Sequence, residues 1–262
     1  MDFYPNNRSS IASAIGKTAK AVLLHTHQTI ILFMTDTEAT HLRQIRSFVR
    51  RQGRITVAQQ YALDNHWQHY GLEFSNDYDL NTVFGHDAPI IMEIGFGNGE
   101  ALAHIAKAHP ENNYIGIEVH RAGVGHLMML LEQQNIQNVR IYCHDAVEVL
   151  EQKIPDGALT GVHLFFPDPW HKKKHHKRRI VSPKFLDLLN KKLKIGGYFH
   201  AATDWQAYAE SMLAVLSENP AFENTSPTSD YCSRPDYRPL TKFEQRGLRL
   251  GHGVWDLIFK LV

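Results

Sequence analysis

The stretch that decides the fold is Ile90-Ile-Met-Glu-Ile-Gly-Phe-Gly-Asn-Gly99. Its first five residues are mostly apolar and suit a short buried strand, and glycine then occupies every second position of a turn. The residues that follow predict a helix over 101–108 and a second strand over 114–119. A strand, a glycine turn and a helix in this order are typical of a parallel α/β sheet that holds a ligand at the turn.

The same alternation of strand and helix continues toward the C-terminus. We predict strands at 139–143, 161–165, 198–202 and 254–262, and helices at 123–134, 146–152, 182–193 and 205–217. Ser182 followed by Pro183 marks the start of one helix, because proline is favoured at the first helical position. The pattern predicts a doubly wound, mainly parallel sheet with ligands at the carboxyl ends of its strands.

The chain before this domain falls into two parts. We expect residues 1–37 to be an extension that is poorly ordered or not translated, with Met34 as an alternative start. Residues 38–84 are expected to form a basic arm and a helix over 59–71 that packs on the main domain at 85–262. The arm has no acid in twelve residues, which favours contact with phosphate. Its five arginines are Arg43, Arg46, Arg50, Arg51 and Arg54.

The composition is that of a globular chain and argues against a disordered or membrane-spanning protein. The 262 residues are 43% apolar and 21% charged, which is typical of a globular chain, and the net charge of +1 leaves nucleic-acid affinity to local patches. The two cysteines show no paired spacing and suit the reducing cytoplasm. The apolar run at 21–34 is too short to cross a membrane. We therefore expect no membrane partner. We also expect the protein to be a monomer or a weak homodimer.

A second informative stretch runs from Leu164 to Arg179. Asp168 follows a predicted strand and stands between two prolines, which hold the backbone extended. Trp170 can supply a flat stacking surface beside the carboxylate, although a core position suits it equally well. Every residue from His171 to Arg179 is Lys, Arg or His, a density that suits a polyanion.

The histidines of this run do not indicate a metal site. His171 and His175 have a spacing that brings two ligands together on a helix, and His176 lies next to them. Six nearby Lys and Arg side chains would repel a divalent cation, and no neighbouring carboxylate or thiolate completes a ligand set. We predict no metal.

The glycine turn alone fits several adenosine-containing cofactors. Here the glycines are Gly95, Gly97 and Gly99, and Glu100 stands where the dinucleotide fingerprint has its third glycine. A nicotinamide-dependent oxidoreductase is therefore the least favoured class.

Three acids stand at or near the ends of three consecutive predicted strands: Glu93, Glu118 and Asp145. Glu93 would repel a pyrophosphate but suits a ligand that carries an ammonium and a sulfonium. Glu118 has the position from which an acid binds ribose hydroxyls, and Asp145 ends the strand where an adenine would lie. This arrangement points to S-adenosylmethionine, with helix capping by the same acids as the structural alternative.

These segments resemble the bacterial tRNA (guanine-N7)-methyltransferase family, whose members are class I methyltransferases. The resemblance implies a seven-stranded, Rossmann-like sheet. The resemblance extends from about Arg43 to Val262. The motifs that carry it are Glu93-Ile-Gly-Phe-Gly, Gly116-Ile-Glu-Val-His120, His144-Asp-Ala146, Phe165-Phe-Pro-Asp-Pro-Trp-His171, Ala202-Thr-Asp-Trp205, Thr241-Lys-Phe-Glu-Gln-Arg246 and Gly251-His-Gly-Val-Trp255.

The resemblance implies S-adenosylmethionine as cofactor, tRNA as partner and 7-methylguanosine in the variable loop as product. It implies cofactor contacts at the glycine turn, Glu93, Glu118, Asp145 and Asp168, with Asp168 at the catalytic position. The implied substrate contacts are Lys172, Asp204, Thr241, Lys242, Phe243 and Glu244. The implied RNA contacts are Lys174, His175, His176, Lys177, Arg178 and Arg179.

Guanine N7 carries an in-plane lone pair, so it accepts a methyl group without losing a proton. The enzyme then needs alignment more than a base, and alignment supplies ~7–11 kcal/mol in favourable cases. We predict that Asp168 orients the guanine and stabilises its developing positive charge. Two alternatives remain: a methyltransferase that modifies an exocyclic amine, and a tRNA-binding scaffold without catalysis.

Overall fold

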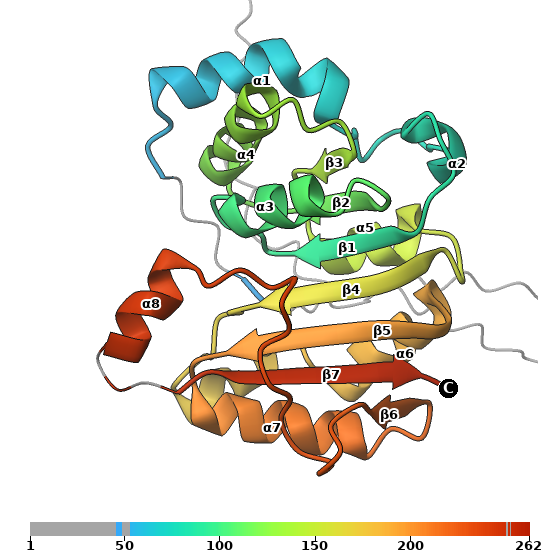
Figure 1. The fold of residues 1–262 in the computed structure, drawn as a ribbon, viewed down its shortest axis with the longest axis vertical. Coiled ribbons are helices and arrows are strands. Elements are labelled where there is room, and N and C mark those ends of the chain that lie inside the picture. Colours follow the sequence, from blue (N-terminus) through green and yellow to red (C-terminus); the bar gives the residue numbers. More distant parts are fainter. Residues whose placement is uncertain (1–45, 49–52, 250, 252) are drawn as a thin grey trace, which may run out of the picture. The chain divides into compact units, whose positions relative to one another are not determined.

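The computed structural model is built around a twisted sheet with the strand order β3-β2-β1-β4-β5-β7-β6 (Figure 1). Five strands are parallel: β1 (Ile90–Ile94), β2 (Asn113–Ile117), β3 (Val139–Tyr142), β4 (Leu159–Phe165) and β5 (Leu193–Thr203). β7 (Trp255–Leu261) pairs antiparallel with β5 and with β6 (Phe222–Asn224). The predicted doubly wound, mainly parallel seven-stranded sheet is confirmed.

The structure describes residues 46–48, 53–249, 251 and 253–262. The predictions for residues 1–37 and for Arg43, Arg50 and Arg51 lie outside these residues. Within them, no helix is long and apolar enough to cross a membrane.

Helices cover both faces of the sheet. α1 (Val57–Tyr70), α3 (Glu100–Ala108) and α4 (Arg121–Gln133) share one apolar cluster, on the face of β1 that carries Ile91. α5 (Ala146–Lys153), α6 (Pro183–Lys192) and α7 (Gln206–Ser217) share the other cluster, on the face that carries Met92. The remaining short elements are α2 (Leu80–Val83), the 3-10 helix η1 (Lys173–Arg178) and α8 (Lys242–Arg249).

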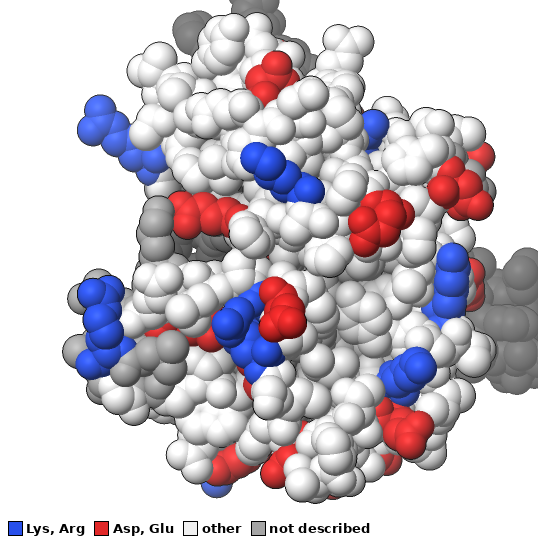
Figure 2. Space-filling model, viewed as in Figure 1, with Lys and Arg blue, Asp and Glu red and all other residues white. Residues whose placement is uncertain are grey.

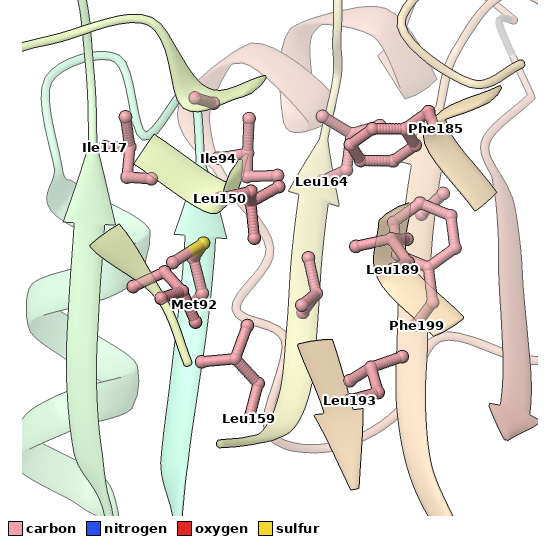
Figure 3. Packing of buried hydrophobic residues seen from close by; sticks show 14 of the residues in the cluster. Met92, Ile94, Ile117, Leu150, Leu159, Leu164, Phe185, Leu189, Leu193 and Phe199 are labelled. Carbon is pink, nitrogen blue, oxygen red and sulfur yellow. The ribbon is translucent and has the colours of Figure 1, made fainter. Parts of the chain in front are cut away.

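The core on the Met92 face is aliphatic and aromatic throughout. Figure 3 shows Met92 of β1, Leu164 of β4 and Phe199 of β5 packed with Leu150 of α5 and Leu189 of α6. All five are almost fully buried. Each such side chain contributes about 1.5–3 kcal/mol relative to an exposed one, so this layer fixes how the strands and helices sit beneath the site.

Several predicted boundaries match the structure. β1 has the predicted bounds, and Ser182 caps α6 by accepting a hydrogen bond from the Phe185 N–H at 3.4 Å. The helix predicted over 59–71 is α1, whose Ala62 and Leu63 belong to the same apolar cluster as α4, as predicted.

The start of β5 was predicted wrongly. The sequence predicted a helix up to Leu193 and a strand only from Tyr198, with Gly196-Gly197 as the break between them. In the structure the helix ends at Lys192, and β5 begins at Leu193 and continues through Gly196, whose φ is +77°. The glycine therefore bends a long strand instead of ending a helix. β6, three residues long, was not predicted.

Candidate active site

A cavity of about 230 Å³ lies at the carboxyl ends of β1, β2 and β4. Gly95, Glu118 and Asp168, which follow these three strands, all line it, and Phe48 of the basic arm lines it as well. Open parallel sheets bind their ligands at this edge. The structure thus brings the glycine turn, the second acid and the acid between two prolines to one place.

The glycine turn adopts a backbone that other residues rarely adopt. Gly95, Gly97 and Gly99 have φ values of +72°, +59° and +76°. A Cβ on Gly99 would lie 2.6 Å from the Cβ of Leu127, and a Cβ on Gly123 would lie 2.1 Å from the carbonyl oxygen of Gly97. Glycine is needed on both sides of this contact, because it lets the start of α4 pack directly against the turn.

Glu118 holds the turn to the end of β2. One carboxylate oxygen accepts a hydrogen bond from the Gly97 N–H at 2.9 Å, and the other accepts from the N–H groups of Val119 (2.7 Å) and His120 (3.0 Å). The side chain is buried but lines the cavity. Its position is thereby fixed by three backbone donors.

Asp145 acts as a helix cap in this structure. Its Oδ1 accepts from the Val147 N–H at 3.0 Å at the start of α5. Its neighbours His144 and Ala146 line the cavity, and Nε2 of His144 is hydrogen-bonded to the Glu148 carboxylate at 2.6 Å. Asp145 therefore makes the helix-capping contact that the sequence offered as an alternative to cofactor binding.

Glu93 is buried in the middle of the sheet, with 3% of its surface exposed. Burial raises the pKa of its carboxyl to about 8. Its Oε2 has no hydrogen-bond partner among the described residues, and the same holds for Nδ1 of His163, its register neighbour in β4. Buried polar atoms are nearly always paired, so these two atoms indicate a place where a polar ligand or water would bind.

The segment after β4 is held from several sides. The Phe166 N–H donates to the Ala202 carbonyl at 2.7 Å, and both Phe166 and Trp170 have positive φ, +51° and +50°. Non-glycine residues in this region often mark functional sites. Between them, Asp168 is exposed and lines the cavity.

The basic run divides into outward and inward side chains. Lys172, Lys173, Lys174, His176 and Lys177 are exposed on and beside η1. Arg178 instead lies over the Trp170 ring at 4.9 Å. Arg179 lies over the Tyr208 ring at 4.6 Å and donates from Nε to the Pro169 carbonyl at 3.0 Å. The last arginine therefore fixes the backbone next to Asp168.

A buried polar cluster lies over the far half of the sheet, centred on Arg238. Its guanidinium donates twice to Glu244 of α8, at 2.8 and 2.9 Å, and twice to Asp256 of β7, at 2.7 and 2.8 Å. Asp256 also bonds Nε2 of His200 at 2.7 Å, and Nδ1 of His200 bonds the Tyr237 hydroxyl at 2.7 Å. We call these five residues the arginine cluster.

The arginine cluster is paired throughout and contacts the segment that leads to Asp168. Burial alone would lower the pKa of Arg238, but its bonds to the two carboxylates raise it overall. Burial opposes ionisation of Asp256 as well, yet His200 and Arg238 lower its pKa overall. The Arg238 guanidinium lies 5.6 Å from the ring centre of Phe166, two residues before Asp168.

The cluster also anchors α8, which carries the predicted substrate segment. Thr241 accepts from the Glu244 N–H at 3.1 Å and so caps the helix, and the Glu244 carboxylate faces Arg238. Figure 1 shows α8 on the side to which β1, β4 and β5 point. Asp204 is half-buried directly after β5, on the same side.

Comparison with known proteins identifies the family of the chain. Residues 87–257 match a family model described as a putative methyltransferase. The tRNA (guanine-N(7)-)-methyltransferase of Klebsiella pneumoniae is 57% identical over 87% of this chain and 95% of its own. That of Aeromonas hydrophila is 57% identical over 84% and 94%. The chain belongs to the tRNA (guanine-N(7)-)-methyltransferase family.

The strand-end acids of this chain were predicted from the sequence, whereas most of the arginine cluster was not. The members that were not predicted are His200, Tyr237, Arg238 and Asp256. A signal was present: His163 in β4, Tyr198 and His200 in β5 and Asp256 in β7 are polar residues at alternating positions of otherwise apolar strands. Such positions face a covering layer, which here includes Tyr237 and Arg238.

Proposed function

We propose that the protein transfers a methyl group from S-adenosylmethionine to N7 of a guanine in the variable loop of tRNA, giving 7-methylguanosine in the cytoplasm. The observation that carries the proposal is the position of Asp168 on the same cavity as Gly95 and Glu118, in a chain 57% identical to a tRNA (guanine-N(7)-)-methyltransferase. Asp168 is thereby within the site where the cofactor and the base would meet.

The residues at the strand ends fit this cofactor. Bound S-adenosylmethionine would supply the methyl group as an activated sulfonium. The turn at Gly95 and the buried carboxylates of Glu118 and Glu93 supply the space and the acids that its hydroxyls and ammonium need. The unpartnered Oε2 of Glu93 supports this assignment, because a cationic group nearby would pair it. Asp145 completes the set from the end of β3.

Asp168 is assigned two roles that need no proton transfer. N7 would form the new bond to the methyl carbon with its own lone pair while the carbon–sulfur bond breaks and its electron pair returns to sulfur. The positive charge thus moves from sulfur to the guanine, and no proton is released. A carboxylate fixed by Pro167 and Pro169 accepts hydrogen bonds from the base and stabilises that charge. The bond from Arg179 to the Pro169 carbonyl keeps this backbone in place.

The tRNA backbone would bind beside the cavity. We assign phosphate contacts to Lys172, Lys174 and Lys177, with His175 and His176 next to them, because η1 exposes the lysines close to Asp168. Charged groups are scattered over the face shown in Figure 2, so this local run matters more than the net charge. Arg178 and Arg179 serve the same surface mainly by shaping it.

The substrate assignments for Asp204 and the segment Thr241, Lys242, Phe243 and Glu244 stay proposals. Asp204 would contact the target nucleotide from the end of β5. Glu244 would act through α8, since its carboxylate is bound to Arg238.

Methyl transfer from labelled S-adenosylmethionine to unmodified tRNA, followed by nucleoside analysis, tests the function. We expect labelled 7-methylguanosine, which is cationic and labile to alkali. A label on an exocyclic amine would keep the cofactor but overturn the target atom. Binding of tRNA without any transfer of label would support the scaffold alternative.

A further inference from the structure

Two tryptophans lie close to the Asp168 segment, and the structure gives them different surroundings. Trp170 donates its indole N–H to the Ser47 carbonyl at 3.1 Å, and Arg178 lies over its ring at 4.9 Å. His175 approaches the same ring edge-on, with 5.9 Å between the ring centres. A base that stacked on the Trp170 face covered by Arg178 would have to displace that guanidinium.

Trp205 is more exposed than Trp170, although His171 packs edge-on against its ring. It is 40% exposed, the largest aromatic side chain with that exposure among the described residues. Its backbone is fixed, because its N–H donates to Thr203 Oγ1 at 3.2 Å and its carbonyl accepts from the first turn of α7. The ring is therefore held at a defined place while its surface stays accessible.

The sheet register places Trp205 at the same edge as Asp168. Phe165 of β4 pairs with Ala202 of β5, and Asp168 and Trp205 each lie three residues beyond these two paired positions. His171 links the two segments, since its ring packs edge-on against Trp205 with 4.2 Å between the ring centres. The aromatic surface and the carboxylate thus flank the same end of two adjacent strands.

We propose that Trp205 is the stacking surface for the target guanine, and that it binds the methylated base more tightly than the unmodified one. This inference rests on the proposed function. Methylation leaves the guanine ring cationic, because N7 gains a methyl group and no proton departs. A cation is attracted to the face of an indole more than a neutral ring is, so stacking strengthens as the reaction proceeds.

Steady-state kinetics of the full-length protein test the proposal. Base–aromatic stacking accounts for about tenfold or more in binding, so Trp205→Leu should raise KM for tRNA about tenfold. Inhibition by tRNA that already carries 7-methylguanosine should weaken further still, so the ratio of its inhibition constant to KM rises. The salt dependence of tRNA binding should not change, because no phosphate contact is lost.

Two further variants make the outcome decisive. Trp205→Phe keeps an aromatic face and should fall between wild type and Trp205→Leu, and it serves alone if the leucine variant does not fold. Tyr61→Leu, at a 62% exposed aromatic of α1, is the control and should behave as wild type. Unchanged KM and product inhibition in both Trp205 variants would overturn the proposal. Absence of 7-methylguanosine from the wild-type reaction would instead overturn the proposed function.

Discussion

One face of the sheet is covered in two different ways. Over β1, β2 and β3 the cover is α3 and α4, and the contact is apolar, with Leu102 and Leu127 fully buried. Over β4, β5 and β7 the contact includes the arginine cluster, in which Arg238 joins Asp256 of β7 to Glu244 of α8. The first half tolerates any side chain of suitable shape, whereas the second requires particular atoms at particular distances.

The difference explains how α8 is held in a fixed position relative to the sheet. Apolar contacts alone would not fix the rotation or the register of this helix. Two bidentate contacts of Arg238 fix both, and the same guanidinium contacts the Phe166 ring just before Asp168. We infer that the polar half sets the geometry of the site, while the apolar half supplies the stable scaffold.

The sharpest comparison pairs conservative substitutions in the two halves. Arg238→Lys keeps the charge but cannot make both bidentate contacts, and breaking a buried ion pair costs about 3–5 kcal/mol. Leu127→Met conserves volume and should cost less than about 1.5 kcal/mol. Urea unfolding measures both changes.

Activity should separate these two variants further. Residual folded Arg238→Lys protein should lose turnover and tRNA affinity, because α8 is no longer fixed, while Leu127→Met should keep both. Equal effects of the two substitutions on stability and turnover would break the proposed division of the face.

Glu93 provides a second comparison, because it is an acid within the apolar half. Its pKa of about 8 in the folded protein exceeds the ordinary value of 4.5, so the folded state holds a proton that the unfolded state has lost. The free energy of unfolding of the free protein should therefore fall as pH rises from about 5 to 8, by up to about 3 kcal/mol. Thermal unfolding across this range measures the slope.

Glu93→Gln isolates that contribution. The variant should lose most of the slope between pH 5 and 8 and should bind S-adenosylmethionine more weakly, as followed by calorimetry. An identical pH slope in wild type and Glu93→Gln would show that Glu93 does not titrate in this way.

The exposed lysines should give a smaller and electrostatic effect. Replacing Lys172, Lys174 and Lys177 by Gln should weaken tRNA binding at low salt and reduce the slope of log affinity against log salt by about 2–3. Stability should stay within about 0.5 kcal/mol, because these side chains are exposed. A matched triple change at Lys107, Lys184 and Lys191, which lie on helices α3 and α6, is the control. Equal salt slopes in the two triple variants would contradict the assignment.

The sequence predicted the parts of the molecule that depend on local pattern. β1 and the Ser182 cap follow from apolar runs and helix-start signals, which act over a few residues. The strand-end acids could be placed because parallel strands share one edge. β6 was missed because it has three residues, and α8 because it has eight residues of which only Phe243 and Leu248 carry large apolar side chains.

The rest depends on contacts between distant segments. The arginine cluster joins residues from 200 to 256. The alternating polar positions of the strands indicate a covering layer, but they do not indicate which residues pair across it. Arg179 shows the same limit: its place in a run of cations predicts phosphate contact, yet its bond to the Pro169 carbonyl and its stacking on Tyr208 turn it inward. Charge density identifies a basic surface but not which of its members face the solvent.

Asp168 is assigned the role of orienting the base and stabilising its charge at the cavity formed by the strand ends. The most direct test is the single-turnover rate of methyl transfer to tRNA by Asp168→Ala, with S-adenosylmethionine affinity measured in parallel. We predict a rate at least about 100-fold below wild type, as for the loss of other fixed charge-stabilising groups, with cofactor affinity changed less than about tenfold. A rate within a few-fold of wild type would show that Asp168 neither orients the base nor stabilises its charge.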